Sequence, residues 1–318
     1  FRKSLGKYTK AACFAKFHEL VEDNRLPDDA NSLFLAKKLK VGHIGTLDPN
    51  ATGLVLAAFG EATKIIPYLK VDPKRYKGVV KFGIETDSAD IVGKVIGQGP
   101  ENWVRPEDEE MDNICSSFTG TISQKPPIYS AVHINGKRAY DLARENKITL
   151  EDMPTKLVDV FKLSYRFLSD DEMEIDVTCG SGTFIRSLAR DLSVSMGTKG
   201  LLKSLDRVQM GNFCLDSGED HKVYTLKELL DMISLPLYIP PRHDFGRSML
   251  MDIVHGNRLS KTMSEFNNLR DGMYSIYYEH SELPKKVGNN EFSRPVALVT
   301  KNGPEWKYVR NFNYKEHW

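Results

Sequence analysis

The sequence has 318 residues and is 41% hydrophobic, enough for one large or two ordinary globular domains. It contains no run of about eighteen apolar residues, so we expect no membrane span. The four cysteines are scattered without a CxxC pair, which argues against a zinc site or a disulfide framework and favours a reducing cytoplasm.

The net charge of +1 hides a segregation along the chain. Residues 37–81 hold nine lysines or arginines against three acids, which gives +6, and residues 82–112 hold nine acids against two bases, which gives −7. A basic stretch of this kind suits contact with phosphates. From charge alone, a solvated lysine-rich face explains it about as well.

The N-terminal part of the chain predicts helices. Residues 11–22 have an amphipathic helical period, and residues 33–40 form a second short helical segment. The sequence opens on Phe1 rather than Met, so we expect it to be a trimmed piece, and we identify no signal peptide.

The segment GHIGTLDPNATG, residues 42–53, is the most informative part of the sequence. It places Asp48 between a glycine-containing turn and the apolar run 54–65, and an acid at the edge of a core needs either a partner or a chemical role. An isolated Asp-Pro pair most often only opens a turn. Here the neighbouring glycines allow close backbone approach, and His43 lies five positions upstream of the acid.

The middle of the chain alternates strand, turn and helix signals. Asn135-Gly136 predicts a two-residue hairpin turn. Residues 180–197 change to a helical period, with Thr183 as the expected N-cap and Gly197 as the expected C-cap. The other predicted elements are a strand at 76–84 that could pair with 90–96, a short helix after the acidic stretch 101–112, a helix at 138–146 and a half-buried strand at 172–179.

The C-terminal part predicts a small β-rich domain. A helical region at 220–235 precedes a proline cluster at 236, 240 and 241, so we place a domain boundary near residue 236. The short strands expected beyond it are 249–260, 271–279, 294–302 and 306–312.

Residues 41–66 resemble the nucleophile motif of the TruB family of pseudouridine synthases, GHxGTLDPxATGxLxxxxGxATK. Four further segments resemble the family in the family's order: 74–78, 124–146, 179–192 and 205–211. The resemblance implies that Asp48 is the nucleophile, that Tyr76 contacts the target base and that Arg186 pairs with the acid. It also implies that His43, Lys64, Phe184 and Leu205 contact the substrate RNA.

The chemistry agrees with these residue types. Converting uridine into pseudouridine breaks the bond from N1 to the ribose and rejoins the base through C5, without redox change or phosphate transfer, so we expect neither cofactor nor metal. A carboxylate serves as nucleophile or stabilises charge on the sugar. An arginine fork beside it favours the ionised form and orients it.

Simpler interpretations of these residues stay open. Arg186 could be a surface arginine on an amphipathic helix, and Tyr76 a core tyrosine on a strand. His43 could fix its own turn, and Lys64 could be a solvated lysine. The role assigned to Leu205 rests almost entirely on the resemblance, because most buried leucines serve only to pack the core.

The sequence also departs from the family. KSLGKYT, residues 3–9, stands where the family has KPxGxTS, which puts the first strand in doubt. Phe184 stands where the family mostly has tyrosine, so one hydroxyl hydrogen bond is missing.

These observations predict an α+β protein with a pseudouridine synthase fold. We expect a long mixed, mainly antiparallel sheet flanked by helices in residues 1–235, with a thumb-like RNA-binding insertion at 124–152. Residues 236–318 would form a small PUA-like domain. The resemblance implies a cytoplasmic monomer that isomerises uridine 55 in the tRNA T-loop without a protein partner.

Three other functions are alternatives to this one. A subunit of an H/ACA-type guide-RNA particle is disfavoured by the thumb-like segment and the short C-terminal region. A non-catalytic tRNA chaperone would not require Asp48. A nucleotide-binding domain is weakly supported, because neither GxGxxG nor GxxxxGK[ST] occurs.

Overall fold

A computed structural model of the chain describes residues 40–214, 224, 226–239, 253, 259, 263, 266–278 and 294–312. The chain divides into two compact units: a first unit of residues 46–55 and 71–221, and a second unit of residues 1–45, 56–70 and 222–318. The segments predicted at 3–9 and 11–22, all of 33–40 except residue 40, and most of 249–260 lie outside the described residues.

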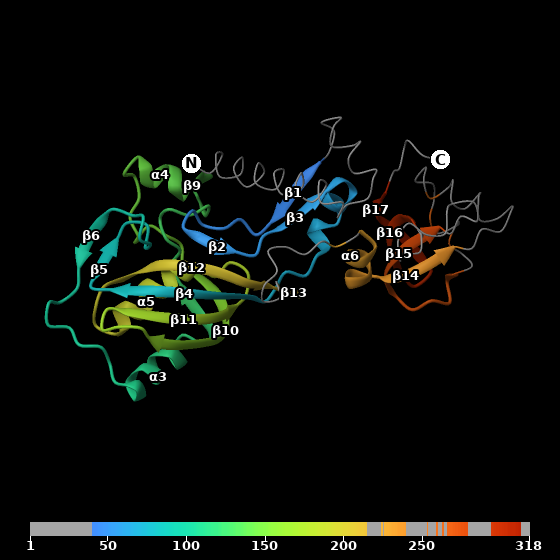
Figure 1. Ribbon diagram of the computed structural model, residues 1–318. Coiled ribbons are helices and arrows are strands. Elements are labelled where there is room, and N and C mark those ends of the chain that lie inside the picture. The colour runs from blue at the N-terminus through green and yellow to red at the C-terminus, as the bar shows by residue number, and fades with distance from the viewer. Residues whose placement is uncertain are drawn as a thin grey trace, which may run out of the picture. The chain divides into compact units, whose positions relative to one another are not determined.

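The first unit is built on one mixed, mainly antiparallel sheet (Figure 1). Its strand order is β13-β12-β4-β11-β10-β7, and β2 runs parallel to β12. The strands are β2 (Ala51–Gly53), β4 (Lys74–Phe82), β7 (Gly120–Gln124), β10 (Lys156–Phe167), β11 (Glu172–Cys179), β12 (Gly200–Met210) and β13 (Phe213–Cys214). The predicted α+β sheet architecture is confirmed.

The alternation of β11 shows why the sheet has one core face. Met173, Ile175, Val177 and Cys179 are buried, while the residues between them are half-buried on the other face. Helices α3 (Asp108–Ser117) and α5 (Ile185–Ser195) pack with these strands in one apolar core. The strand predicted at 172–179 is therefore confirmed with the same bounds.

Short hairpins extend the first unit. In the hairpin of β8 (His133–Ile134) and β9 (Lys137–Arg138), Asn135 and Gly136 both have positive φ, at 48° and 79°, as the predicted two-residue turn requires. Helix α4 (Ala139–Arg144) follows directly.

Two local predictions in the first unit need correction. The segment 90–96 was expected to pair as a strand, but β5 (Ile84–Thr86) pairs with β6 (Val95–Gln98), and Asp90 instead forms an isolated bridge with Leu202. Thr183 is not the N-cap of α5. That position belongs to Phe184, and the Thr183 hydroxyl donates to the Gly180 carbonyl at 3.0 Å.

The described residues of the second unit form two separate sheets. In one, β1 (Val41–Ile44) pairs antiparallel with β3 (Leu56–Phe59), followed by the short 3-10 helices η1 (Gly60–Lys64) and η2 (Ile66–Tyr68). An added Cβ at Gly42 would lie 2.7 Å from the end of the Ile66 side chain, which would have to shift to make room for it.

The other sheet of the second unit is C-terminal. Helix α6 (Leu226–Ile233) precedes strands in the order β14-β15-β16-β17, which are β14 (Leu235–Ile239), β15 (Gly272–Tyr278), β16 (Arg294–Asn302) and β17 (Glu305–Asn311). Ile276, Val299 and Trp306 belong to its buried core. These strands are consistent with the small PUA-like domain expected from the sequence.

Candidate active site

Asp48 lies in a β-turn that enters the first unit's sheet. The Ala51 N–H donates to the Asp48 carbonyl at 3.0 Å, so the Asp-Pro pair does open a turn. Strand β2 follows and runs beside β12. Gly53 permits this close approach, since its φ is +96° and an added Cβ would collide with the Arg207 backbone.

The side chain of Asp48 is held by Arg186. The Arg186 Nε donates to Oδ2 at 2.9 Å and its Nη2 donates to Oδ1 at 3.3 Å, which makes a two-point fork. The Arg186 side chain is 5% exposed and that of Asp48 is 29% exposed. The acid therefore reaches solvent while the base that orients it is buried, and the predicted ion pair is present in the structure.

Arg186 has further acceptors that fix its guanidinium. Its Nη1 donates to the Ser88 carbonyl at 2.9 Å, and its Nη2 donates to the Tyr129 carbonyl at 3.2 Å. A buried arginine whose donors are satisfied in this way cannot easily swing away from the acid.

The start of α5 is fixed from a distant strand. Gln124 at the end of β7 clamps the backbone of Phe184: its Oε1 accepts from the Phe184 N–H at 2.9 Å, and its Nε2 donates to the Phe184 carbonyl at 3.1 Å. This amide fixes the residue at which α5 begins, although the helix has no side-chain cap hydrogen bond. Because Arg186 lies two residues further on, the clamp sets where its side chain begins.

A second carboxylate, Asp90, is buried beside Arg186, and the sequence interpretation missed it. It is 2% exposed, and its Oδ2 lies 3.7 Å from the Arg186 Nη1. Its Oδ1 accepts from the Ser88 hydroxyl at 2.6 Å and from the Val92 N–H at 3.2 Å. Two carboxylates thus share one guanidinium. The available signal was an acid next to the apolar pair Ile91-Val92 inside a stretch counted only for its charge.

Tyr76 on β4 packs against the core of the first unit, half-buried. Burial is the main cause that raises the pKa of its phenol, and the negative charge of Asp48 adds to this effect. Arg207 acts in the opposite direction through its charge and a hydrogen bond. Tyr76 is therefore a neutral phenol at neutral pH, and it lies close enough to Asp48 for the charge of that carboxylate to raise its pKa.

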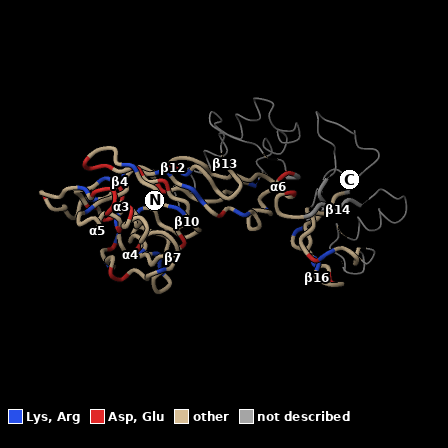
Figure 2. The backbone as a smooth tube through the Cα atoms, turned by 90° about the horizontal axis from the view of Figure 1, so that it is seen from below, with Lys and Arg blue, Asp and Glu red and all other residues tan. Residues whose placement is uncertain are grey.

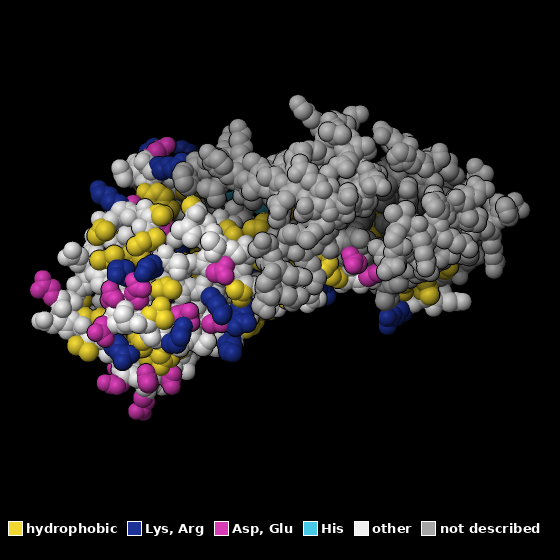
Figure 3. Space-filling model, viewed as in Figure 1, with side chains coloured by type: hydrophobic (Ala, Val, Ile, Leu, Met, Phe, Trp, Pro, Cys, Tyr) yellow, Lys and Arg dark blue, Asp and Glu magenta, His cyan; other side chains and the backbone are white. Residues whose placement is uncertain are grey.

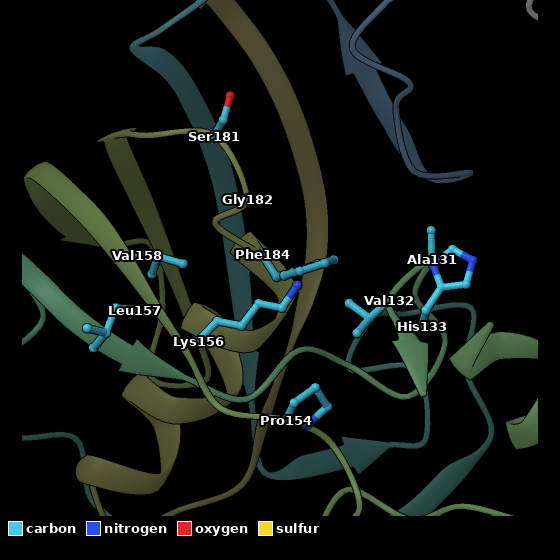
Figure 4. A pocket seen from close by; sticks show the side chains of 10 residues that line it. All are labelled: Ala131, Val132, His133, Pro154, Lys156, Leu157, Val158, Ser181, Gly182 and Phe184. Carbon is cyan, nitrogen blue, oxygen red and sulfur yellow. The ribbon is translucent and has the colours of Figure 1, made fainter. Parts of the chain in front are cut away.

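Leu205 and Phe184 have different surroundings. Leu205 is 7% exposed and is part of the apolar core against which Tyr76 packs. Phe184 lines a cavity of about 690 Å³ in the first unit. Figure 4 shows Lys156 of β10 extending toward Phe184, with Val132 and His133 across from them. The remaining lining residues are Ala131, Pro154, Leu157, Val158, Ser181 and Gly182.

His43 and Lys64 lie in the second unit. His43 is half-buried on β1, directly opposite Ala57 of β3. Lys64 ends η1, where its ammonium pairs with Glu61 at 2.5 Å. Their expected contacts with RNA stay predictions.

Much of the basic stretch after residue 70 is neutralised within the first unit. Arg75 pairs with Asp176 at 2.6 Å and Lys81 with Asp171 at 2.7 Å. Figure 3 shows basic and acidic side chains interleaved on one face of this unit, and Figure 2 places acidic residues at the start of α3. The surplus of charge along the sequence is therefore smaller in space than the count implied.

The described residues include no cluster of three or more His, Cys, Asp or Glu side chains that could hold a metal ion. Among these same residues, no helix is long and apolar enough to cross a membrane. Cys115, Cys179 and Cys214 are free thiols.

Comparisons with known proteins identify the family of the chain. Residues 33–185 match the model of the TruB family pseudouridylate synthase N-terminal domain. The tRNA pseudouridine synthase B of Bordetella avium is 40% identical over 177 residues, covering 56% of this chain and 72% of that protein. The enzyme of the same name from Mycoplasma mobile is 36% identical over 217 residues, covering 67% and 74%.

A solved Cbf5-Nop10-Gar1 complex contains a chain of 19% identity and TM-score 0.47, covering 82% of this chain and 69% of that one. The sequence identity to the two synthases extends over more than two thirds of each of them. The chain therefore belongs to the TruB family of pseudouridine synthases.

Proposed function

We propose that this chain isomerises uridine to pseudouridine in tRNA, at position 55 of the T-loop. The observation that carries the proposal is the fork between Asp48 and the buried Arg186. It offers an oriented, half-buried carboxylate that solvent still reaches, as attack on a sugar carbon requires. The similar proteins from two organisms are both named tRNA pseudouridine synthase B, which supports tRNA as the substrate.

The reaction follows from this arrangement. Asp48 approaches C1′ of the target uridine as the bond from C1′ to N1 breaks, and the electron pair of that bond leaves with the base. The carboxylate bonds to C1′ or stabilises its positive charge. The base then turns so that C5 attacks C1′, the carboxylate is released, C5 loses its proton and N1 gains one. No atom is gained or lost overall, so no cofactor or metal is needed.

We assign the other residues around this step. Tyr76 stacks on the base and lies near the C5 proton. Phe184 and Leu205 flank the base, and the missing hydroxyl at Phe184 removes one polar contact. The target base must leave its stack, at a cost of a few kcal/mol. His43 fills the space vacated in the loop, and Lys64 faces the phosphates.

RNA binding would use the rest of the chain. Residues 124–152 act as a thumb that grips the T-stem-loop, and residues 236–318 form a PUA-like RNA-binding domain. The cavity beside Phe184 supports this role, since it combines apolar walls with the cation of Lys156. We propose that the chain works as a monomer in the cytoplasm, without a guide RNA or a protein partner.

The direct test uses the purified chain and unmodified tRNA transcripts without other macromolecules. We expect pseudouridine at position 55, mapped by a carbodiimide primer-extension assay, and none in a transcript whose T-loop uridine is replaced by cytidine. Product only when guide RNA and accessory proteins are added would favour the H/ACA-type alternative. Tight tRNA binding and refolding with no product would favour the chaperone.

A further inference from the structure

Arg207 on β12 is a buried cation that the proposed reaction does not yet use. It is 2% exposed. Its Nε and Nη2 donate to the Leu54 carbonyl at 2.8 and 2.6 Å, and its own carbonyl accepts from the Leu54 N–H at 2.7 Å. Three hydrogen bonds therefore join Arg207 to the residue that follows β2, six positions after Asp48.

Arg207 is also the cross-strand partner of Tyr76. The two residues stand opposite each other where β12 pairs with β4. The positive charge of Arg207 favours the ionised form of the Tyr76 phenol and so lowers its pKa. Arg207 thus binds the segment that carries the acid and stands opposite the aromatic residue assigned to the base.

We propose that Arg207 is a positioning residue for isomerisation, which holds the segment after Asp48 in a fixed place beside β4 and Tyr76. This inference rests on the function proposed above. A 1 Å misplacement of a reacting group can cost about 10²-fold in rate, so such a frame has a measurable kinetic effect.

A purely structural role makes a different prediction. An arginine that only satisfied the Leu54 carbonyl would affect folding stability but not the ionisation of Tyr76. The charged or titratable groups that influence the Tyr76 phenol are Arg207 from β12, Cys179 from β11 and Asp48 from the turn before β2. Of these, Arg207 lowers the pKa of Tyr76 and the other two raise it, so removing Arg207 must raise it further.

The test compares Arg207→Gln, which removes the charge, with Arg207→Lys, which keeps the charge but loses the fork. The control is Arg75→Gln, which removes an exposed arginine from β4 that pairs with Asp176. Ionisation of Tyr76 is followed by NMR of carbon-13-labelled tyrosine, with Tyr76→Phe identifying the signal. Single-turnover pseudouridine formation and tRNA affinity are measured on the same proteins.

We expect Arg207→Gln to shift Tyr76 ionisation to higher pH and to slow single turnover by about 10²-fold with unchanged tRNA affinity. Arg207→Lys should slow turnover while leaving the ionisation of Tyr76 near its original pH, and Arg75→Gln should change neither. If Arg207→Gln does not fold, the lysine variant alone decides: wild-type turnover would overturn the proposal.

An unmoved Tyr76 titration in folded Arg207→Gln would also overturn the proposal. The titration needs no substrate, so it separates this inference from the function on which it rests. Absence of pseudouridine formation by the unmodified chain would defeat the proposed function, whatever the titration shows.

Discussion

Two carboxylate–arginine forks in the first unit can be compared directly. In the inner fork, Arg186 binds Asp48 at 2.9 and 3.3 Å. In the outer fork, Arg75 binds Asp176 at 2.8 and 2.6 Å. The outer fork is the shorter one. The two acids are similarly exposed, at 29% and 25%, but the arginine side chains are 5% and 45% exposed.

The difference between the forks therefore lies in the environment of the arginine. Arg75 faces water, where an ion pair contributes little and salt screens it. Arg186 is enclosed with two backbone carbonyls and a second acid, Asp90. A fork becomes a candidate for catalysis when its cation is fixed and its acid remains reachable, and fork geometry alone does not identify it.

The largest expected effect is loss of the inner acid. Asp48→Asn keeps the shape of the side chain but removes the nucleophile, so pseudouridine formation should fall below detection while tRNA binding persists. Single-turnover assays and filter binding on one preparation check both. The matched outer change, Asp176→Asn, should leave the rate within about twofold of the unmodified chain, because a surface pair is worth at most about 1 kcal/mol. Retained product from Asp48→Asn would refute the assignment.

Removing the arginine of each fork should lower the free energy of unfolding by different amounts. Arg186→Gln leaves buried carboxylate charge without its partner, and breaking a buried pair costs about 3–5 kcal/mol. Arg75→Gln should cost less than about 1 kcal/mol. Urea unfolding of the two variants measures both losses. Equal losses of unfolding free energy would show that burial of Arg186 does not strengthen its fork.

Asp90 distinguishes the inner fork from the outer one. Asp90→Asn removes its charge 3.7 Å from the Arg186 guanidinium while keeping an oxygen for the Ser88 and Val92 bonds. We expect turnover to fall by roughly tenfold, equivalent to about 1.4 kcal/mol in the barrier. If steady-state turnover equals that of the unmodified chain, Asp90 does not contribute to catalysis and only Asp48 and Arg186 do.

The smallest effect concerns the outer fork and pH. The hydrogen bond from Arg75 holds the pKa of Asp176 below its ordinary value of 3.8. Its contribution is therefore present above pH 3.8 and is lost as pH falls through the lower folded value. Unfolding curves of Asp176→Asn and the unmodified chain should differ by less than about 1 kcal/mol at pH 7 and converge in acid. A difference in unfolding free energy that grows as the pH falls would contradict this expectation.

The sequence allowed several of these features to be predicted because their signals are local. The Asn135-Gly136 turn and the alternation of 172–179 follow from residue type and spacing. The pair of Asp48 and Arg186 spans 138 positions and was predicted only because both segments resemble one family.

Other features depend on contacts between distant residues. Gln124 holds the backbone at the start of α5 from 60 positions away. Asp90 faces Arg186 through a loop in which Ala89 has a φ of 58°, which no residue pattern indicated. Arg207 lies within the segment 205–211 that resembles the family, but its bonds to Leu54 arise only when β2 runs beside β12.

The most direct test of the central claim is a structure of the Asp48→Asn variant with a tRNA T-stem-loop. We expect the target uridine out of its stack, with its C1′ about 3–3.5 Å from the side chain at position 48 and Arg186 still behind that side chain. RNA bound with that uridine stacked in its loop, or with its C1′ at roughly twice this distance or more, would contradict the account.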